Sequence, residues 1–290
     1  MTFLAIGSII TLLFWASAWG HFGLLGEYSF FPLWLGYILI TNGLAEIAFG
    51  TSLLTRMRSM FGWLFAFSIP LWWFFEQINK VVQNWHYILL HPISNLHYAV
   101  QASVSFSTVI PAVLSTCYLM YPYVARRLST FETYNISIRT SYLIVAFCLG
   151  TFSFFLLYRF PHQTFPLVWI APLLIFEPTA YKLGLPCLLR SFQKSGVTIP
   201  ATSMVATLVT GFWWELWNFY SLPKWYYTIP YVGFWKLFEM PALGYLGYPF
   251  FGLFVVSYTA ASVFVFTKIN LFEYFSDEMR LLRNHPNNKK

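Results

Sequence analysis

Charged residues are scarce in this sequence. Only 9% of its 290 residues are charged, whereas 58% are hydrophobic, and apolar stretches recur along the whole length. Ordinary soluble domains carry about 25% charged and roughly 45–50% apolar residues. A water-soluble fold has no means of covering so much apolar surface, so the composition predicts an integral membrane protein.

Cysteine is also rare, and the familiar signatures of catalysis are missing. The three cysteines lie far apart in the chain, at Cys117, Cys148 and Cys187. This spacing excludes a disulfide framework, a zinc motif and a haem-attachment motif. Phosphate loops, nucleophile elbows and dinucleotide fingerprints are absent. His86, His91 and His97 cluster but lack a fourth ligand, so no metal site is predicted, and the sequence identifies no cofactor.

Long apolar stretches are what the sequence does contain. A membrane-spanning helix needs about 20 mostly apolar residues. Eight stretches meet this requirement, at 3–20, 31–54, 60–79, 98–122, 141–160, 165–188, 200–220 and 245–267. The first is interpreted as a retained helix, because no positive charge precedes it as in a signal peptide. The predicted fold is therefore an all-α polytopic membrane helix bundle of about eight transmembrane helices.

The basic residues between these stretches indicate an orientation. Four of the 17 Lys and Arg residues lie on one side of the predicted bundle, at Lys80, Arg159, Lys224 and Lys236. The other 13 lie on the opposite side, which the positive-inside rule places in the cytoplasm. This orientation predicts that both termini are cytoplasmic, with Ser29 and Thr228 outside and Ser129 inside. The expected location is the bacterial inner membrane. The net charge of +7 is thus a topology signal, and no nucleic-acid partner is predicted.

Two parts of the chain resemble each other. The pattern Trp73-x-x-Glu76-x-x-Asn79 followed by Trp85-His86-Tyr87 matches Phe212-x-x-Glu215-x-x-Asn218 followed by Trp225-Tyr226-Tyr227. This match predicts two four-helix membrane repeats, 1–134 and 135–270, and a basic cytoplasmic tail, 271–290. Duplicated membrane folds place a cavity between their halves. Chance similarity among aromatic-rich helices is the alternative.

Four glutamates fall inside the predicted spans, at Glu46, Glu76, Glu177 and Glu215. A charged carboxylate near the bilayer centre costs about 2.5–3.5 kcal/mol, so such residues usually face the protein interior or a wet cavity. Glu76 and Asn79, and likewise Glu215 and Asn218, have i,i+3 spacing on one helix face. Each asparagine is therefore expected to donate a hydrogen bond to its carboxyl. Local pairs with Asn42 and Lys182 account for the other two glutamates.

Three roles remain open for Glu76 and Glu215. They form polar contacts between helices, or act as neutral catalytic acids that deliver a proton, or belong to an ion or proton pathway. Glu215 is specifically expected to be a neutral, hydrogen-bonding acid at an aromatic cavity.

The segment 224–249 is aromatic, and Gly and Pro interrupt it, so it is interpreted as an interfacial or re-entrant cap. Aromatic residues make up 22% of the chain, which suggests either an aromatic-lined interior or bulky helix packing. Glu239 is the acid of the cap that is expected to face a cavity, with an exposed interfacial position as the alternative. The predicted ligand-binding residues are Asn79, Asn218, Trp214, Trp225, Tyr226 and Glu239.

Two resemblances follow from these motifs. The second half resembles an uncharacterised tryptophan-rich family of bacterial polytopic membrane proteins, which implies no chemistry. The order of several motifs is distantly similar to the membrane-embedded lycopene (carotenoid) cyclase domain, a helical unit used in tandem or as a heterodimer. These motifs are Pro172-Leu173-Leu174, Arg190, Trp214-Glu215, Trp225-Tyr226 and Pro249-Phe250-Phe251. That family places an acidic pair after a proline, where this chain has Phe238-Glu239-Met240-Pro241.

The favoured function is an aromatic-lined intramembrane cavity that binds an isoprenoid, pigment or lipid. One alternative is a cyclase-like membrane enzyme that uses a buried glutamate as general acid and stabilises a carbocation on aromatic faces. Another is a transporter or an accessory subunit of a membrane complex. Membrane lipid is an expected partner in every case.

Overall fold

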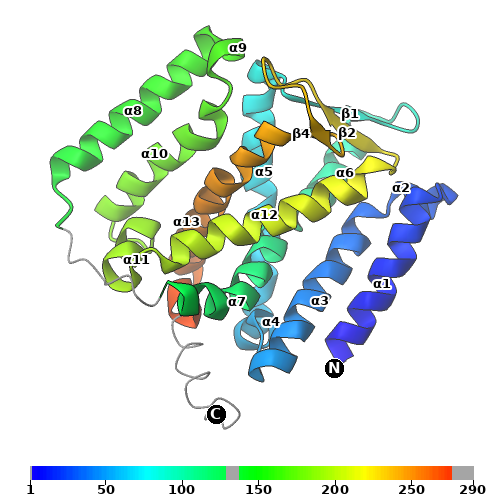
Figure 1. Cartoon of the computed structure of the whole chain (residues 1–290), viewed down its shortest axis with the longest axis horizontal. Coiled ribbons are helices and arrows are strands. Elements are labelled where there is room, and N and C mark those ends of the chain that lie inside the picture. Colours follow the sequence, from blue (N-terminus) through cyan, green and yellow to red (C-terminus); the bar gives the residue numbers. More distant parts are fainter. Residues whose placement is uncertain (1, 129–136, 276–290) are drawn as a thin grey trace.

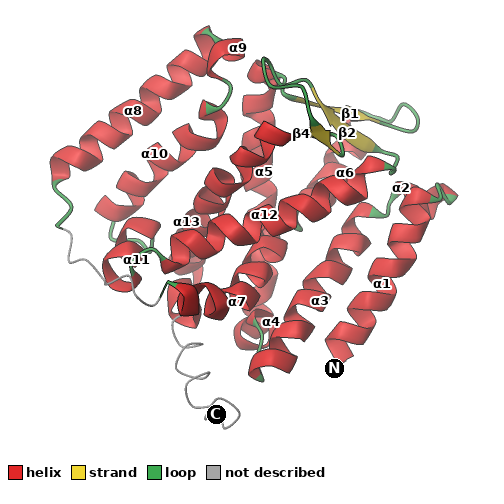
Figure 2. Cartoon of the chain, viewed as in Figure 1, coloured by secondary structure: helices red, strands yellow, loops and turns green. Residues whose placement is uncertain are grey.

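The computed structural model describes residues 2–128 and 137–275, and most of them are helical (Figures 1 and 2). Within these residues the long helices are α1 (Thr2–Trp19), α3 (Phe30–Phe49), α5 (Gly62–Val82), α7 (Val109–Arg127), α8 (Thr140–Arg159), α10 (Leu167–Lys182), α12 (Thr198–Phe219) and α13 (Gly247–Thr267). Each predicted apolar stretch overlaps one of them. The helical fold class is therefore confirmed.

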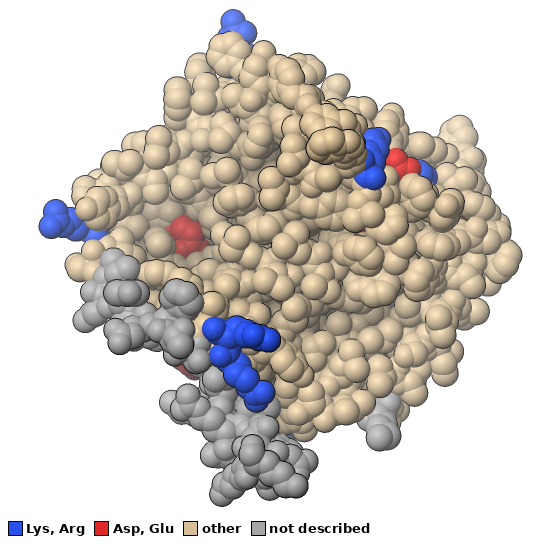
Figure 3. Space-filling view, in the orientation of Figure 1, with Lys and Arg blue, Asp and Glu red and all other residues tan. Residues whose placement is uncertain are grey.

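Five helical stretches of the described chain are long and apolar enough to cross a membrane: Thr2–Trp19, Phe30–Phe49, Asn95–Arg127, Thr140–Arg159 and Ala242–Thr267. Helix α10 is shorter, with 16 residues. Helices α5 and α12 are less apolar because Glu76 and Glu215 and other polar residues lie near their ends. Few charged groups interrupt the face shown in Figure 3, as expected of a surface in contact with lipid.

Close helix packing depends on glycine where α1 meets α3. A Cβ atom on Gly7 would lie 2.7 Å from the carbonyl oxygen of Gly36, and one on Gly43 would lie 2.5 Å from the nitrogen of Leu4. Small residues let two backbones approach in this way, and such contacts are typical of helix pairs in membranes. Helix α8 packs on α10 in a similar side-by-side arrangement on the opposite flank (Figure 1).

Short elements connect the long helices: α2 (Gly23–Glu27), α4 (Leu53–Met57), η1 (Arg58–Phe61), α6 (Asn95–Phe106), α9 (Pro161–Thr164), α11 (Leu188–Ser195) and η2 (Ala242–Leu246). Gly50 ends α3 with a φ of 75°, a left-handed conformation that favours glycine. Ser52 and Thr55 then form a capping box that starts α4.

Polar side chains on α3 and α10 also hold these connections, which corrects the predicted local pairs. The Oδ1 atom of Asn42 accepts a hydrogen bond from the backbone N–H of Leu54 at 2.9 Å. Glu177 accepts from the backbone N–H groups of Leu188 at 3.1 Å and Leu189 at 2.9 Å. The first turn of a helix has free N–H groups that need acceptors, and these contacts supply them.

Two small sheets were not predicted. Strand β1 (Trp85–Ile88) pairs antiparallel with β2 (Lys224–Tyr227), and β3 (Lys236–Leu237) pairs with β4 (Met240–Pro241). The predicted cap thus consists of β2, β3, β4 and η2. In Figure 1 the β1–β2 pair lies at one end of the bundle, away from α4 and α11. This pair joins segments that the sequence assigned to separate halves.

The predicted tail begins inside the packed structure. Leu271 and Phe275 are buried, and the Phe275 ring lies 6.3 Å and 5.7 Å from the ring centroids of Tyr118 and Tyr121 on α7. Leu271, Phe272 and Phe275 are therefore part of the core. The remainder of the predicted tail, 276–290, lies outside the described residues.

Candidate binding cavity

A cavity of about 500 Å³ lies among the central helices and the β1–β2 pair. Its volume falls in the range of roughly 300–1,000 Å³ that is typical of small-molecule sites. Aromatic side chains from α5, β1, α10, α12, β2 and α13 line it: Trp72, Trp85, Trp169, Trp214, Trp225 and Phe251. The walls thus come from segments on both sides of the chain's midpoint.

The aromatic rings of the cavity wall pack against one another. Trp85 stacks on Trp169 with ring centroids 6.2 Å apart, and Trp214 stacks on Tyr248 at 6.1 Å. Trp72 meets Phe251 edge to face at 5.7 Å. Offset stacks and edge contacts are the preferred geometries of aromatic pairs, so these contacts hold the side chains of the wall in place.

Asn79 and Asn218 hold the backbone of the strands. The amide of Asn79 donates to the carbonyl oxygen of Trp85 at 2.7 Å and accepts from its N–H at 3.2 Å. Asn218 makes the same two bonds with Trp225, at 2.7 Å and 2.8 Å. The prediction that each asparagine donates to its neighbouring glutamate was therefore wrong. The backbone that leaves the helix needs partners, and each amide satisfies both a donor and an acceptor there.

Glu76 binds side chains of the cavity wall. Its Oε1 atom accepts hydrogen bonds from Trp72 Nε1 and Trp85 Nε1, each at 3.0 Å, and from the Tyr87 hydroxyl at 2.6 Å. All three donors line the cavity, whereas Glu76 does not. The Glu76 carboxyl thus accepts hydrogen bonds from three aromatic side chains of the cavity wall and fixes their orientation.

Glu215 has a similar position in the second half. It is completely buried, and its Oε1 atom accepts hydrogen bonds from the hydroxyls of Tyr227 and Tyr248, both at 2.7 Å. Its Oε2 atom is buried without a hydrogen-bond partner among the described residues. Like Glu76, Glu215 lies outside the cavity lining, and the two tyrosines lie between it and the cavity.

The strand tyrosines keep their protons. Burial raises the pKa of Tyr87 and of Tyr227 well above the usual 10, and the adjacent carboxyls of Glu76 and Glu215 raise both further. Each hydroxyl therefore remains a hydrogen-bond donor across the physiological pH range. The cavity wall presents neutral phenol groups in front of the two carboxyls.

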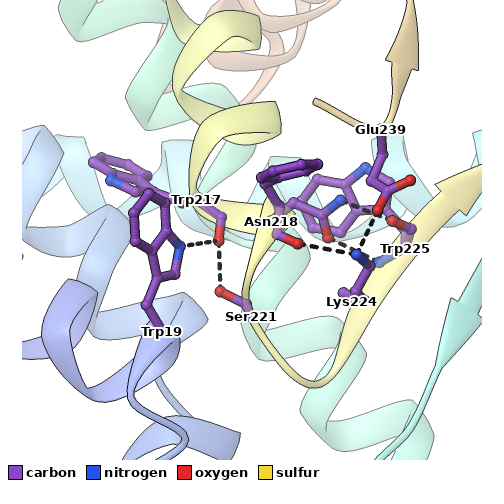
Figure 4. A network of polar contacts seen from close by, with 8 residues as sticks. Trp19, Trp217, Asn218, Ser221, Lys224, Trp225 and Glu239 are labelled. Atoms are coloured by element: carbon purple, nitrogen blue, oxygen red, sulfur yellow. Dashed lines mark hydrogen bonds and ion pairs between the residues drawn. The ribbon is translucent and has the colours of Figure 1, made fainter. Parts of the chain in front are cut away.

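One charged lining residue, Lys224, forms an ion pair with Glu239, as Figure 4 shows. The Lys224 ammonium at the start of β2 binds the Glu239 carboxylate and donates to the carbonyl oxygen of Phe219 at 3.0 Å. Glu239 therefore faces a cation rather than the cavity, and it is only about one-fifth exposed. Tyr226 stacks on His86 at 5.2 Å, and neither lines the cavity. Of the predicted ligand-binding residues, Trp214 and Trp225 do line it.

Glu27, Tyr28 and Gln101 line the cavity although the sequence did not single them out, and His97 was singled out only as a member of the histidine cluster. Helix α2 contributes Glu27, with Tyr28 next to it, and α6 contributes His97 and Gln101. The Tyr28 hydroxyl and His97 Nε2 share a hydrogen bond of 2.8 Å. The only signal for Glu27 and Gln101 was their polarity within an apolar context. The sequence pattern placed Glu27, Tyr28 and His97 between predicted spans and Gln101 near the start of the span 98–122.

The three clustered histidines have separate partners. His86 bonds to the Thr228 hydroxyl at 2.8 Å, and His91 Nε2 lies 3.5 Å from Glu27, whereas His97 contacts Tyr28. In residues 2–128 and 137–275 no three His, Cys, Asp or Glu side chains are grouped so as to hold a metal ion. The histidines instead tie the segments at this end of the bundle together.

Comparison with known proteins gives no relative from which a role could be transferred. No family model, no curated protein and no solved structure matches the chain.

Proposed function

We propose that this protein binds a long apolar ligand, an isoprenoid, pigment or lipid, in the cavity between its two halves. The observation that carries the proposal is the cavity itself, about 500 Å³ in volume and walled by aromatic rings that are fixed by one another and by two buried carboxyls. A site that is already shaped to receive an apolar ligand binds it without the cost of ordering its walls.

We further propose that the halves are a tandem repeat of four membrane helices each, so that eight helices span the bilayer. Asn79 and Asn218 make the same pair of bonds to the backbones of Trp85 and Trp225. The antiparallel register aligns Trp85 with Tyr227, and it aligns Tyr87 with Trp225. An arrangement of equivalent residues about a twofold axis supports duplication, which puts the ligand site on the axis.

The position of the carboxyls favours binding over acid catalysis. A general acid must come within hydrogen-bond reach of the atom that it protonates. Glu76 and Glu215 are separated from the cavity by the tyrosine and tryptophan side chains that donate to them. A protonation step would have to pass through the hydroxyl of Tyr87, Tyr227 or Tyr248.

The proposal is tested by extracting the purified protein with organic solvent. We expect absorbance and mass spectrometry to detect an isoprenoid, a pigment or a defined lipid in a fixed ratio to protein. The control is a helical membrane protein of similar size purified from the same cells in the same detergent. An extract with the same bulk lipid composition as that control, and with no enriched component, would contradict the proposal.

The proposed orientation makes a separate prediction for single cysteines placed in a background with Cys148 changed to serine. Thr228→Cys should react with a membrane-impermeant maleimide in intact cells, and Ser59→Cys should react only after the cells are opened. Both positions are exposed in the structure. Ser29 is unsuitable because it is buried, and Ser129 lies outside the described residues. Labelling of Ser59→Cys in intact cells would reverse the orientation.

A further inference from the structure

Most polar groups that line the cavity already have partners. Lys224 is paired with Glu239, and the hydroxyls of Tyr87, Tyr227 and Tyr248 are bound to carboxyls. A ligand that bonded to these groups would first have to break the hydrogen bonds that they already make. The free energy lost in this way is about as large as the free energy gained from the new bonds. Free hydrogen-bonding capacity for a polar group of the ligand must therefore come from other lining residues.

Glu27 and Gln101 supply that capacity. Glu27 lines the cavity while only 8% exposed, and its partner among the described residues is the imidazole of His91, 3.5 Å away on the exposed side. The Gln101 side chain also lines the cavity and has no hydrogen-bond partner within the described part of the chain. A buried carboxylate with so few bonds is costly unless something else donates to it.

Glu27 and Gln101 come from segments of the lining that contact each other. Gln101 follows His97 by one turn of α6, and His97 is hydrogen-bonded to Tyr28, the residue after Glu27. Residues four apart lie on the same face of a helix. The Tyr28–His97 contact therefore brings the segment that carries the Glu27 carboxylate, an acceptor, close to the face of α6 that carries the Gln101 amide, a donor.

We propose that Glu27 and Gln101 bind a hydroxyl group at one end of the apolar ligand. The hydroxyl donates to the Glu27 carboxylate and accepts from the Gln101 amide, while the apolar part lies against the tryptophans. This inference rests on the proposed function and names the ligand class, a long apolar molecule with a neutral hydroxyl end.

The charges around the cavity exclude a phosphorylated ligand. Lys224 is the one Lys or Arg side chain among the described lining residues, and Glu239 neutralises it. Phosphate groups are usually bound by arginines or by free helix N-termini. Glu27 would instead repel a phosphate, so the polar end of the ligand is not anionic.

The experiment compares three probes that share one polyene chain: all-trans-retinol, the same polyene without its hydroxyl (deoxyretinol), and retinyl phosphate. Energy transfer from the tryptophans to the polyene reports binding to the full chain in detergent. We expect wild-type protein to bind retinol about tenfold more tightly than deoxyretinol, the ratio that one retained hydrogen bond provides. Retinyl phosphate should bind more weakly than retinol.

The variants Gln101→Leu and Glu27→Leu should each lower the preference for retinol, because each removes one of the two hydrogen-bond partners of the hydroxyl, and both variants should still bind deoxyretinol. Retained deoxyretinol binding also shows that a variant is folded. Gln77→Leu, at an exposed glutamine on α5 outside the cavity, serves as the matched control and should keep the preference.

Each outcome in the wild-type protein is decisive. Equal binding of retinol and deoxyretinol, or tightest binding of retinyl phosphate, overturns the hydroxyl site but leaves the apolar cavity intact. If neither retinol nor deoxyretinol binds, the proposed function itself fails. A variant that does not fold changes none of these conclusions, because the comparison of probes in wild-type protein stands alone.

Discussion

Replacing Glu76 with alanine is expected to lower the free energy of unfolding by about 3 kcal/mol or more. Three donors, on Trp72, Trp85 and Tyr87, would lose their shared acceptor at once. Each buried donor left without a partner costs about 1–3 kcal/mol. The loss is measurable as a shift of the denaturant midpoint in detergent, followed by tryptophan fluorescence.

Two further variants define the cause of that loss. Glu76→Gln keeps one oxygen acceptor and should be destabilised less than Glu76→Ala. Glu46→Ala removes a carboxyl of the same kind from α3, where it accepts one long hydrogen bond, 3.3 Å from the Ser52 hydroxyl. That control should cost less than about 1 kcal/mol. Equal destabilisation by Glu76→Ala and Glu46→Ala would show that Glu76 does not organise the cavity wall.

Filling the cavity should abolish ligand binding while leaving the fold in place. Ser105 lies on α6 with its side chain in the cavity lining. In Ser105→Trp an indole occupies space that the ligand needs, and overpacking of this kind costs about 1–3 kcal/mol. We expect the ligand recovered per protein, or the affinity for added retinol, to fall about tenfold or more.

The matched control is Leu96→Trp, which adds an indole to the same helix at a side chain that is 76% exposed and outside the lining. It should retain the ligand at the wild-type level. Thermal unfolding of both variants checks that the helix still packs. Undiminished binding by a folded Ser105→Trp variant would place the ligand somewhere other than this cavity.

The long helices could be predicted because their signal is local. A run such as 141–160 is apolar at nearly every position, and the structure forms α8 there. The strand pair carries no such signal. Trp85–Ile88 is a short aromatic segment whose partner, β2, lies far along the chain. Its pairing depends on where two separate helices end, and a sequence pattern does not reveal that.

The aromatic part of the site could also be predicted, because its signal is local in the sequence. Trp214 and Trp225 were expected from the aromatic motifs, and they line the cavity. The spacing of Glu215 and Asn218 indicated a shared face correctly, but Asn218 bonds to Trp225 on the following strand, and Glu215 accepts from Tyr227 on that strand and from Tyr248 on α13. Residues three apart on a helix also have neighbours outside that helix, and here those neighbours offer better donors.

Glu27 and Gln101 had no recognisable pattern. Their proposed joint role depends on the Tyr28–His97 hydrogen bond, which brings the segment at the end of α2 close to α6. Single polar residues in an apolar sequence are common, and most have a local partner. Only the three-dimensional arrangement shows that these two are left with unused hydrogen-bonding capacity toward a cavity.

The pairing of β1 with β2 has a consequence for the order of folding. His86 and Thr228, which adjoin each other in this pair, are 142 residues apart in sequence. Contacts of such high contact order form slowly, and during synthesis β1 must wait until β2 has left the ribosome. Until then β1 keeps an unpaired edge, which is prone to non-native association. The cavity is therefore expected to form only after both strands have been synthesised, so that the proposed ligand would bind at the last stage of biogenesis.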